Sequence, residues 1–159
     1  MGCGAASICS FAGTHLWSCP LKLTVKSDYA TRAVLGLARA YDSGKAVRVD
    51  DLASRNGVSA NYLVQILIEL KARGIVKSVR GKDGGYLLAR SPGEISFGEV
   101  LRIVHGEVFD TPALSDDNCP TELREAWSKL QVATTDAADA INFQSLLERS
   151  SGKEEMYYI

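Results

Sequence analysis

Residues 59–86, SANYLVQILIELKARGIVKSVRGKDGGY, decide the fold of this 159-residue chain. Ser59 can cap a helix whose apolar residues repeat at helical spacing. Those inward-facing residues are Leu63, Ile66, Leu67 and Leu70. Gly74 ends the helix before the β-rich residues 75–79, and residues 80–86 form a basic, glycine-rich turn leading into a second strand. This order predicts a winged helix-turn-helix.

The residues before this stretch predict the rest of the motif. Residues 24–41 form a helix with one apolar stripe, made of Tyr29, Ala30, Ala33, Val34, Leu37, Ala38 and Tyr41. Residues 47–49 are a candidate short strand, and Asp50 is expected to cap a small helix that runs through Arg55. Gly57 supplies the left-handed turn that separates this helix from the next one.

The residues after it predict a longer helical part. Ser96 and Glu99 form a capping-box pattern, so a helix is expected over residues 97–104. A long helix begins near Pro120, and Asn142 can cap a short helix over 143–149. The long helix carries an apolar stripe, Leu123, Ala126, Trp127, Leu130, Ala133, Ala137 and Ile141. We predict a mainly α fold with a small β-wing and a long C-terminal dimerisation helix; alternatively, the stripe packs on its own domain.

Four segments are expected. Residues 1–20 are expected to be an unstructured extension or the result of a mis-assigned start, in which case the native chain begins at Leu21. Residues 21–105 are the winged domain. Residues 106–149 hold a linker and the dimerisation helices, and residues 150–159 are a loose tail.

The charge distribution is asymmetric. Residues 21–105 carry 14 Lys/Arg against 8 Asp/Glu, a balance of +6, and residues 106–159 carry 4 against 11, a balance of −7. A basic front suits approach to a polyanion in one orientation. No apolar run reaches the roughly 20 residues of a membrane span, and we expect a cytoplasmic protein with no membrane partner.

The outer face of the central helix is polar. With the inner stripe fixed, Asn61 and Gln65 point away from the core, and Tyr62 lies on the flank. Amide side chains can pair with adenine edges, and Arg80 and Lys82 in the turn can contact phosphates. The consecutive Gly84 and Gly85 would let the backbone approach DNA closely. A plain solvated helix face would show the same polarity, and the basic turn favours the DNA interpretation.

Three motifs together resemble the Rrf-two family of bacterial transcriptional regulators, which includes IscR, NsrR and CymR. They are LTVKSDYA at 23–30, VSANYLVQ at 58–65 and VRGKDGGYLL at 79–88, and residues 97–100 (FGEV) open the next helix. The resemblance covers residues 21–149. It implies a homodimer on palindromic double-stranded DNA, acting as a repressor. The expected DNA-binding residues are Lys22, Lys26, Ser27, Tyr29, Ser59, Asn61, Tyr62, Gln65, Arg80, Lys82, Gly84 and Gly85. The expected dimer interface is Leu123, Trp127, Leu130, Ala137 and Ile141.

The cysteines set this chain apart from relatives that hold an iron–sulfur cluster through three cysteines in the linker. Residues 108–119 contain only Cys119, and one thiolate per subunit cannot hold such a cluster in the usual way. We therefore expect no cofactor and no metal. The effector is then a metabolite, a partner enzyme, or the redox state of Cys119. The alternative for Cys119 is an inert residue with no role in sensing.

The competing function is a protein-interaction module that has kept the winged fold without DNA affinity. The basic turn argues against it. An enzyme is not expected, because His15 and His105 are the only histidines and neither has a nucleophile or metal partner at a meaningful spacing.

Overall fold

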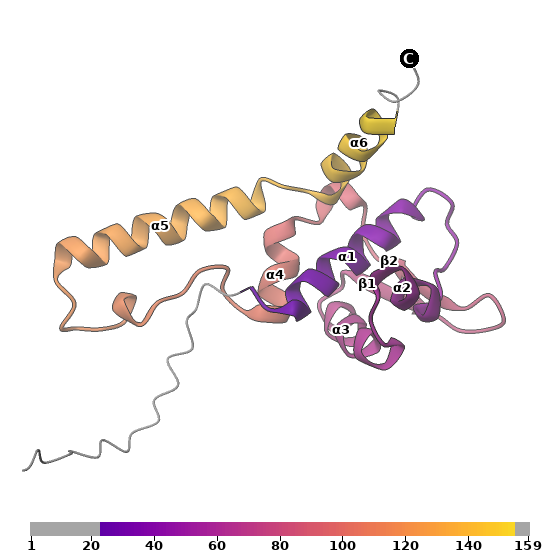
Figure 1. Cartoon of the computed structure of the whole chain (residues 1–159), viewed down its shortest axis with the longest axis horizontal. Coiled ribbons are helices and arrows are strands. Elements are labelled where there is room, and N and C mark those ends of the chain that lie inside the picture. The colour runs from indigo at the N-terminus through magenta and orange to yellow at the C-terminus, as the bar shows by residue number, and fades with distance from the viewer. Residues whose placement is uncertain (1–22, 155–159) are drawn as a thin grey trace, which may run out of the picture.

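The computed structural model describes residues 23–154, and the predicted extension 1–20 lies outside them. The elements are α1 (Val25–Arg39), α2 (Val49–Asn56), α3 (Ala60–Ala72), β1 (Val76–Val79), β2 (Gly85–Leu88), the 3₁₀ helix η1 (Pro92–Glu94), α4 (Phe97–His105), the 3₁₀ helix η2 (Pro112–Leu114), α5 (Thr121–Asp139) and α6 (Phe143–Glu154). Helices α1–α4 gather around one antiparallel hairpin, and α5 extends away from them as an arm (Figure 1). The predicted fold class is confirmed.

The core is built on the inner face of α3. Leu63, Ile66, Leu67 and Leu70 are all fully buried, as their spacing predicted. They pack with Ala33, Val34 and Leu37 of α1 and with Val100 of α4. Because these side chains occupy one side of α3, its opposite side is fixed toward solvent.

The turn between α2 and α3 follows the sequence closely. Gly57 ends α2 in the left-handed conformation, with φ 63° and ψ 33°. The Ser59 hydroxyl then accepts a hydrogen bond from the Tyr62 amide at 3.3 Å, so Ser59 is the cap that was predicted. The start of α2 differs from expectation. Its N-cap is Arg48, which makes no side-chain capping bond. Asp50, the predicted cap, is the second residue of the helix.

The hairpin pairs Val76 with Leu88 and Val79 with Gly85 at its two ends. The candidate strand at 47–49 is reduced to a single bridge residue, because α2 begins at Val49. At this bridge, Val47 exchanges two backbone hydrogen bonds with Tyr86, of 2.9 and 2.8 Å. Residue 47 therefore adds one isolated bridge to the outer edge of β2, and the sheet itself has two strands.

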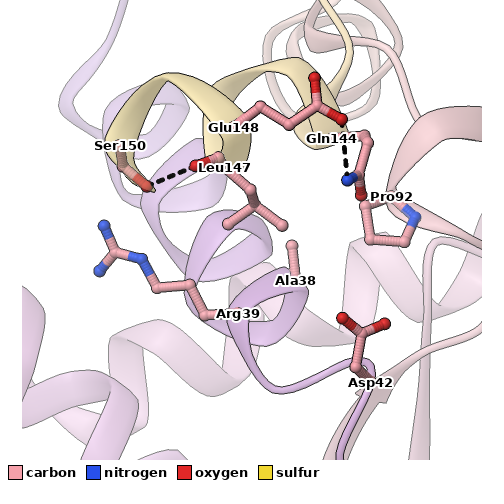
Figure 2. Close-up of a pocket in the computed structure, with 8 residues that line it drawn as sticks. All are labelled: Ala38, Arg39, Asp42, Pro92, Gln144, Leu147, Glu148 and Ser150. Atoms are coloured by element: carbon pink, nitrogen blue, oxygen red, sulfur yellow. Dashed lines mark hydrogen bonds between the residues drawn. The ribbon is translucent and has the colours of Figure 1, made fainter. Parts of the chain in front are cut away.

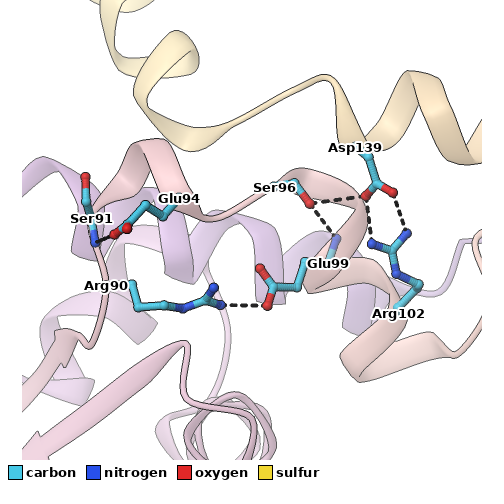
Figure 3. Close-up of polar contacts among 7 residues, drawn as sticks. All are labelled: Arg90, Ser91, Glu94, Ser96, Glu99, Arg102 and Asp139. Carbon is cyan, nitrogen blue, oxygen red and sulfur yellow. Dashed lines mark hydrogen bonds and ion pairs between the residues drawn. The ribbon is translucent and has the colours of Figure 1, made fainter.

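Helix α4 is capped by Ser96, whose hydroxyl accepts from the Glu99 amide at 3.0 Å. Glu99 does not complete the predicted capping box. Its carboxylate instead accepts from Arg90, just after β2, at 2.6 Å (Figure 3). The box occurs one turn earlier, between Ser91 and Glu94 of η1.

The end of α5 is fastened to α4. Arg102 donates to both carboxylate oxygens of Asp139, at 3.1 and 2.7 Å, and Ser96 also bonds Asp139 (Figure 3). The hydrogen bond from Arg102 lowers the pKa of Asp139, and the same bond raises the pKa of Arg102. Both side chains are partly exposed, so solvent screens this pair and its contribution to stability is modest.

After α5 the chain returns to the winged domain. Residues 141–143 run antiparallel to 95–97, with the Phe97 amide bonded to the Ile141 carbonyl at 2.7 Å. Phe143 is fully buried in the core beside Phe97, and Asn142 caps α6 through the Ser145 amide at 2.8 Å. The sequence predicts that this segment belongs with the dimerisation helices and that a loose tail begins at residue 150. In the structure Phe143 belongs to the core of the winged domain, and α6 continues to Glu154.

We expect Phe143→Ala to destabilise the winged domain by about 3–5 kcal/mol, because it removes a large side chain from a fully buried site. The free energy of unfolding is measured by urea denaturation. Gln144→Ala, at the exposed neighbouring position, serves as the control. A loss below about 1 kcal/mol for Phe143→Ala would mean that α6 is not part of this core.

Candidate nucleic-acid interface

The outer edge of α3 is available for contact. Asn61 and Gln65 are exposed, and Ala60 and Val64 are half-buried beside them. Tyr62 is 40% exposed, and its ring meets Tyr29 of α1 edge-on with centroids 6.1 Å apart. Two amide side chains therefore project from a helix whose other face is fully packed, a geometry suited to reading base edges in a major groove.

The loop of the hairpin brings positive charge to the same end of the molecule. Figure 1 shows this loop together with α2 and α3 at the end opposite the α5 arm. Arg80 and Lys82 are exposed. Within residues 23–154 neither side chain has an ion pair or hydrogen bond, so both charges are free to meet phosphates.

The two consecutive glycines have an internal role that the sequence analysis did not foresee. A Cβ on Gly84 would lie 2.7 Å from the Val79 carbonyl oxygen and 2.8 Å from that of Gly81, and a Cβ on Gly85 would collide with the Val47 carbonyl. Neither glycine has a positive φ; in this loop only Gly81 does, at 117°. Packing within the chain therefore requires glycine at 84 and 85, whether or not these residues contact DNA.

The α1 residues in the predicted set fit the interface less well. Lys26 forms an ion pair with Glu69 of α3 at 2.7 Å, which neutralises the charge expected to meet a phosphate. Ser27 is 1% exposed, so its side chain cannot reach DNA, and Tyr29 is half-buried against Tyr62. Lys22 lies outside the described residues.

One residue at this end was missed by the sequence analysis. The Arg48 guanidinium donates to the backbone carbonyl of Lys82 at 2.9 Å, which connects the start of α2 to the hairpin loop. No motif contains Arg48. The signal that could have drawn attention to it is a cation at the N-cap of a helix, where Ser, Thr, Asp or Asn is preferred.

The linker folds back onto α5. Phe109 is buried by stacking on Trp127, with ring centroids 6.0 Å apart, and its carbonyl accepts from Gln131 at 3.1 Å. Trp127 is therefore partly occupied within its own chain rather than fully free for a dimer interface. Cys119 is half-buried at the start of α5, and Arg124 donates to the carbonyls of Asp116 and Cys119.

A pocket of about 740 Å³ lies where the end of α1 meets η1 and α6. Figure 2 shows Arg39 on one side of it and Asp42, Gln144 and Glu148 on the other, across Ala38 and Leu147. Gln144 donates to Glu148 at 3.1 Å. None of the residues that line this pocket belongs to α3 or to the hairpin loop, so the pocket is separate from the candidate interface.

The exposed polar edge of α3, the preceding helix and turn, and the basic hairpin define a winged helix-turn-helix DNA-binding protein. The Rrf2 (Rrf-two) family model, described as iron-dependent transcriptional regulator, matches residues 23–149. The chain belongs to this family, so it is a DNA-binding transcriptional regulator of the helix-turn-helix type and not an enzyme. None of the described helices is long and apolar enough to cross a membrane.

Individual relatives agree with this assignment. The chain is 29% identical over 137 residues to the HTH-type transcriptional regulator CymR of Bacillus subtilis, covering 86% of this chain and 97% of CymR. Among solved structures it resembles T. potens IscR, with a TM-score of 0.71 and 31% identity over 87% of this chain and 97% of that one. The structure of CymR, described as the global cysteine regulator of B. subtilis, matches with a TM-score of 0.72 and 26% identity over 81% and 98%.

We expect Gly85→Ala to weaken DNA binding and to lower stability by about 1–3 kcal/mol, because the new methyl group displaces Val47 from the hairpin. Chemical denaturation and a gel-shift titration measure the two effects. The matched control is Gly93→Ala, where the nearest atom to the new Cβ is 3.8 Å away. Equal behaviour of the two variants would remove the packing role assigned to Gly85.

Proposed function

We propose that this chain is a homodimeric repressor that binds a palindromic operator without an iron–sulfur cluster. The observation that carries the proposal is the exposed edge of α3, where Asn61 and Gln65 project opposite a fully buried stripe. A bound dimer represses transcription when its operator overlaps a promoter, because it excludes polymerase from the same DNA.

The proposed contacts divide into two kinds. Arg80 and Lys82 bind phosphates, which gives affinity and position without sequence information. Asn61 and Gln65 read base edges, with Tyr62 beside them. The backbone amide of Ser59, at the N-terminus of α3, binds a phosphate of the DNA backbone. We leave out the side chains of Lys26 and Ser27, since one is paired with Glu69 and the other is buried.

The proposal predicts different effects for the two kinds of contact. Gln65→Ala should relax preference at one base pair at a cost of about 1–3 kcal/mol on the operator, and leave binding to random duplex unchanged. Arg80→Ala should weaken binding to both and reduce the log–log salt slope by about 0.9. Fluorescence anisotropy at several salt concentrations measures both, on an operator recovered by genomic pull-down.

Two results would contradict these roles. Equal losses for Gln65→Ala on operator and on random duplex would show that this side chain does not read sequence. Absence of binding to any duplex at low salt by the unmodified chain would instead favour a protein-interaction module that has kept the winged fold.

The homodimer is supported by the surface of α5. Of its 19 residues only Ala138 is buried, while Leu123, Leu130 and Val132 are 48%, 46% and 54% exposed. Leu123, Leu130 and Ala137 recur every seven residues of α5, and Trp127 and Thr134 lie between them with the same spacing. Ile141, which the sequence placed on this stripe, lies beyond the end of α5 in the segment paired with residues 95–97. A stripe with this spacing suits pairing with a second helix, and each Å² of apolar surface removed from water contributes about 25 cal/mol.

We expect Leu130→Glu to convert the dimer into a folded monomer, because it places a charge in the middle of this stripe. Ser128→Glu adds the same charge at an exposed position off the stripe and should remain dimeric. Light scattering after size exclusion gives the mass, and gel shift should show weaker operator binding for Leu130→Glu alone. A dimer that survives Leu130→Glu would overturn α5 as the interface.

The residues near Cys119 do not fit an iron–sulfur cluster. Cys119 is the only cysteine of residues 106–120, and its neighbouring carbonyls are engaged by Arg124. Within the described part of the chain, no three His, Cys, Asp or Glu side chains are grouped to hold a metal ion. A cluster needs several thiolates, and this donor set offers one. We therefore propose regulation by a metabolite, a partner protein or the redox state of Cys119.

This part of the proposal departs from the iron dependence in the family's description, so it is tested directly. Protein purified without oxygen should contain iron and sulfide far below one cluster per subunit. The same assay on a chain beginning at Leu21, which lacks Cys3, Cys9 and Cys19, shows whether those cysteines supply ligands. Brown protein with stoichiometric iron and sulfide would contradict the proposal.

A further inference from the structure

The first turn of α2 is built in an unusual way. At the N-caps of α3 and α4, Ser59 and Ser96 accept a hydrogen bond from an amide of the first turn. At the N-cap of α2 stands Arg48, with φ −70° and ψ 144°, and no side chain caps the helix there. The backbone has the geometry of a capped helix, but the residue is a long cation that cannot accept a hydrogen bond.

Arginine is unfavourable at this place for a second reason. The N-terminus of a helix carries partial positive charge, so a cation there is repelled, although Asp50 and Asp51 in the first turn reduce the effect. The side chain turns instead to the hairpin loop. Its guanidinium donates to the Lys82 carbonyl at 2.9 Å, 34 residues along the chain.

The backbone beside Arg48 is already joined to the base of the hairpin. Val47 exchanges two hydrogen bonds with Tyr86, and Gly85 lies so close to the backbone at 47 and 48 that no side chain fits. Further out, the exposed loop has one backbone bond of its own, from the Gly84 amide to the Gly81 carbonyl at 3.0 Å. The Arg48 side chain adds a second attachment, from outside the hairpin, at Lys82.

We propose that Arg48 is a positioning residue that holds the hairpin loop in the orientation in which Arg80 and Lys82 meet DNA. The inference rests on the proposed function and adds to it. Arg48 acts through the loop, since its guanidinium donates to the Lys82 carbonyl, and the double-mutant cycle below separates this role from direct contact with DNA. That bond uses the backbone of Lys82 and leaves its ammonium group free.

The test is Arg48→Ser, which supplies a capping hydroxyl to α2 and removes the bond to Lys82. Arg55→Ser, on the same helix, exposed and without a hydrogen bond or ion pair in the described structure, loses the same charge as a control. We expect the thermal midpoint of Arg48→Ser to be unchanged or raised, and amide exchange of the DNA-free protein to become faster at Gly84, whose amide makes the loop's own backbone hydrogen bond. Operator binding should weaken about tenfold, the scale of one lost hydrogen bond to a charged group.

A double-mutant cycle separates positioning from direct contact. In a chain that also carries Arg80→Ala and Lys82→Ala, the loop has no charges left to position, so Arg48→Ser should have no further effect on affinity. An equal loss in both backgrounds would show direct contact of Arg48 with DNA and overturn the inference. Unchanged loop exchange in Arg48→Ser would overturn it as well.

These outcomes are distinct from failure of the proposed function. Failure of the unmodified chain to bind any duplex would remove the function, while the exchange measurement would still report whether Arg48 holds the loop. Normal binding by the unmodified chain, with identical affinity for Arg48→Ser, would leave the function standing and remove only the role of Arg48.

Discussion

Burial of the Leu and Ile stripe of α3 against α1 and α4 is the interaction on which the rest of this structure depends. Leu63, Ile66, Leu67 and Leu70 are completely removed from water, and together they fix the rotation of α3 about its axis. That rotation leaves Asn61 and Gln65 in solvent. An amide side chain placed one position earlier or later in α3 would point into the core or away from the exposed edge. The hydrophobic core therefore also determines which side chains can reach DNA.

Two other segments are organised around this core. The hairpin is joined to the start of α2 by the Val47–Tyr86 bonds and by Arg48, which relates the basic loop to the helix-turn-helix. The C-terminal part leaves the domain at α4, forms the exposed helix α5, and returns through Phe143. The end of α5 is fastened to α4 by the pairing of Asp139 with Arg102, which relates the apolar stripe of α5 to the winged domain. Such an arrangement suits a dimer that must place two reading helices on one duplex.

The sequence predicted the elements whose cause is local. Helical spacing gave the buried stripe of α3, and the caps at Ser59, Ser96 and Asn142 and the turn at Gly57 are set by side chains within a few residues. It did not predict contacts between distant segments. The pairing of Lys26 with Glu69, the burial of Phe143 and the packing of Gly85 on Val47 depend on tertiary structure, and these contacts redefine which predicted residues are free to bind.

The most direct test of the central claim is amide hydrogen exchange of the full chain with and without a duplex recovered by genomic pull-down. The account predicts slower exchange in the complex at residues 59–65 and 80–84, with residues 141–150 unchanged on binding. Slower exchange confined to α5 and α6, with residues 59–65 and 80–84 unchanged, would contradict it, because DNA would then be bound by a surface other than the outer edge of α3.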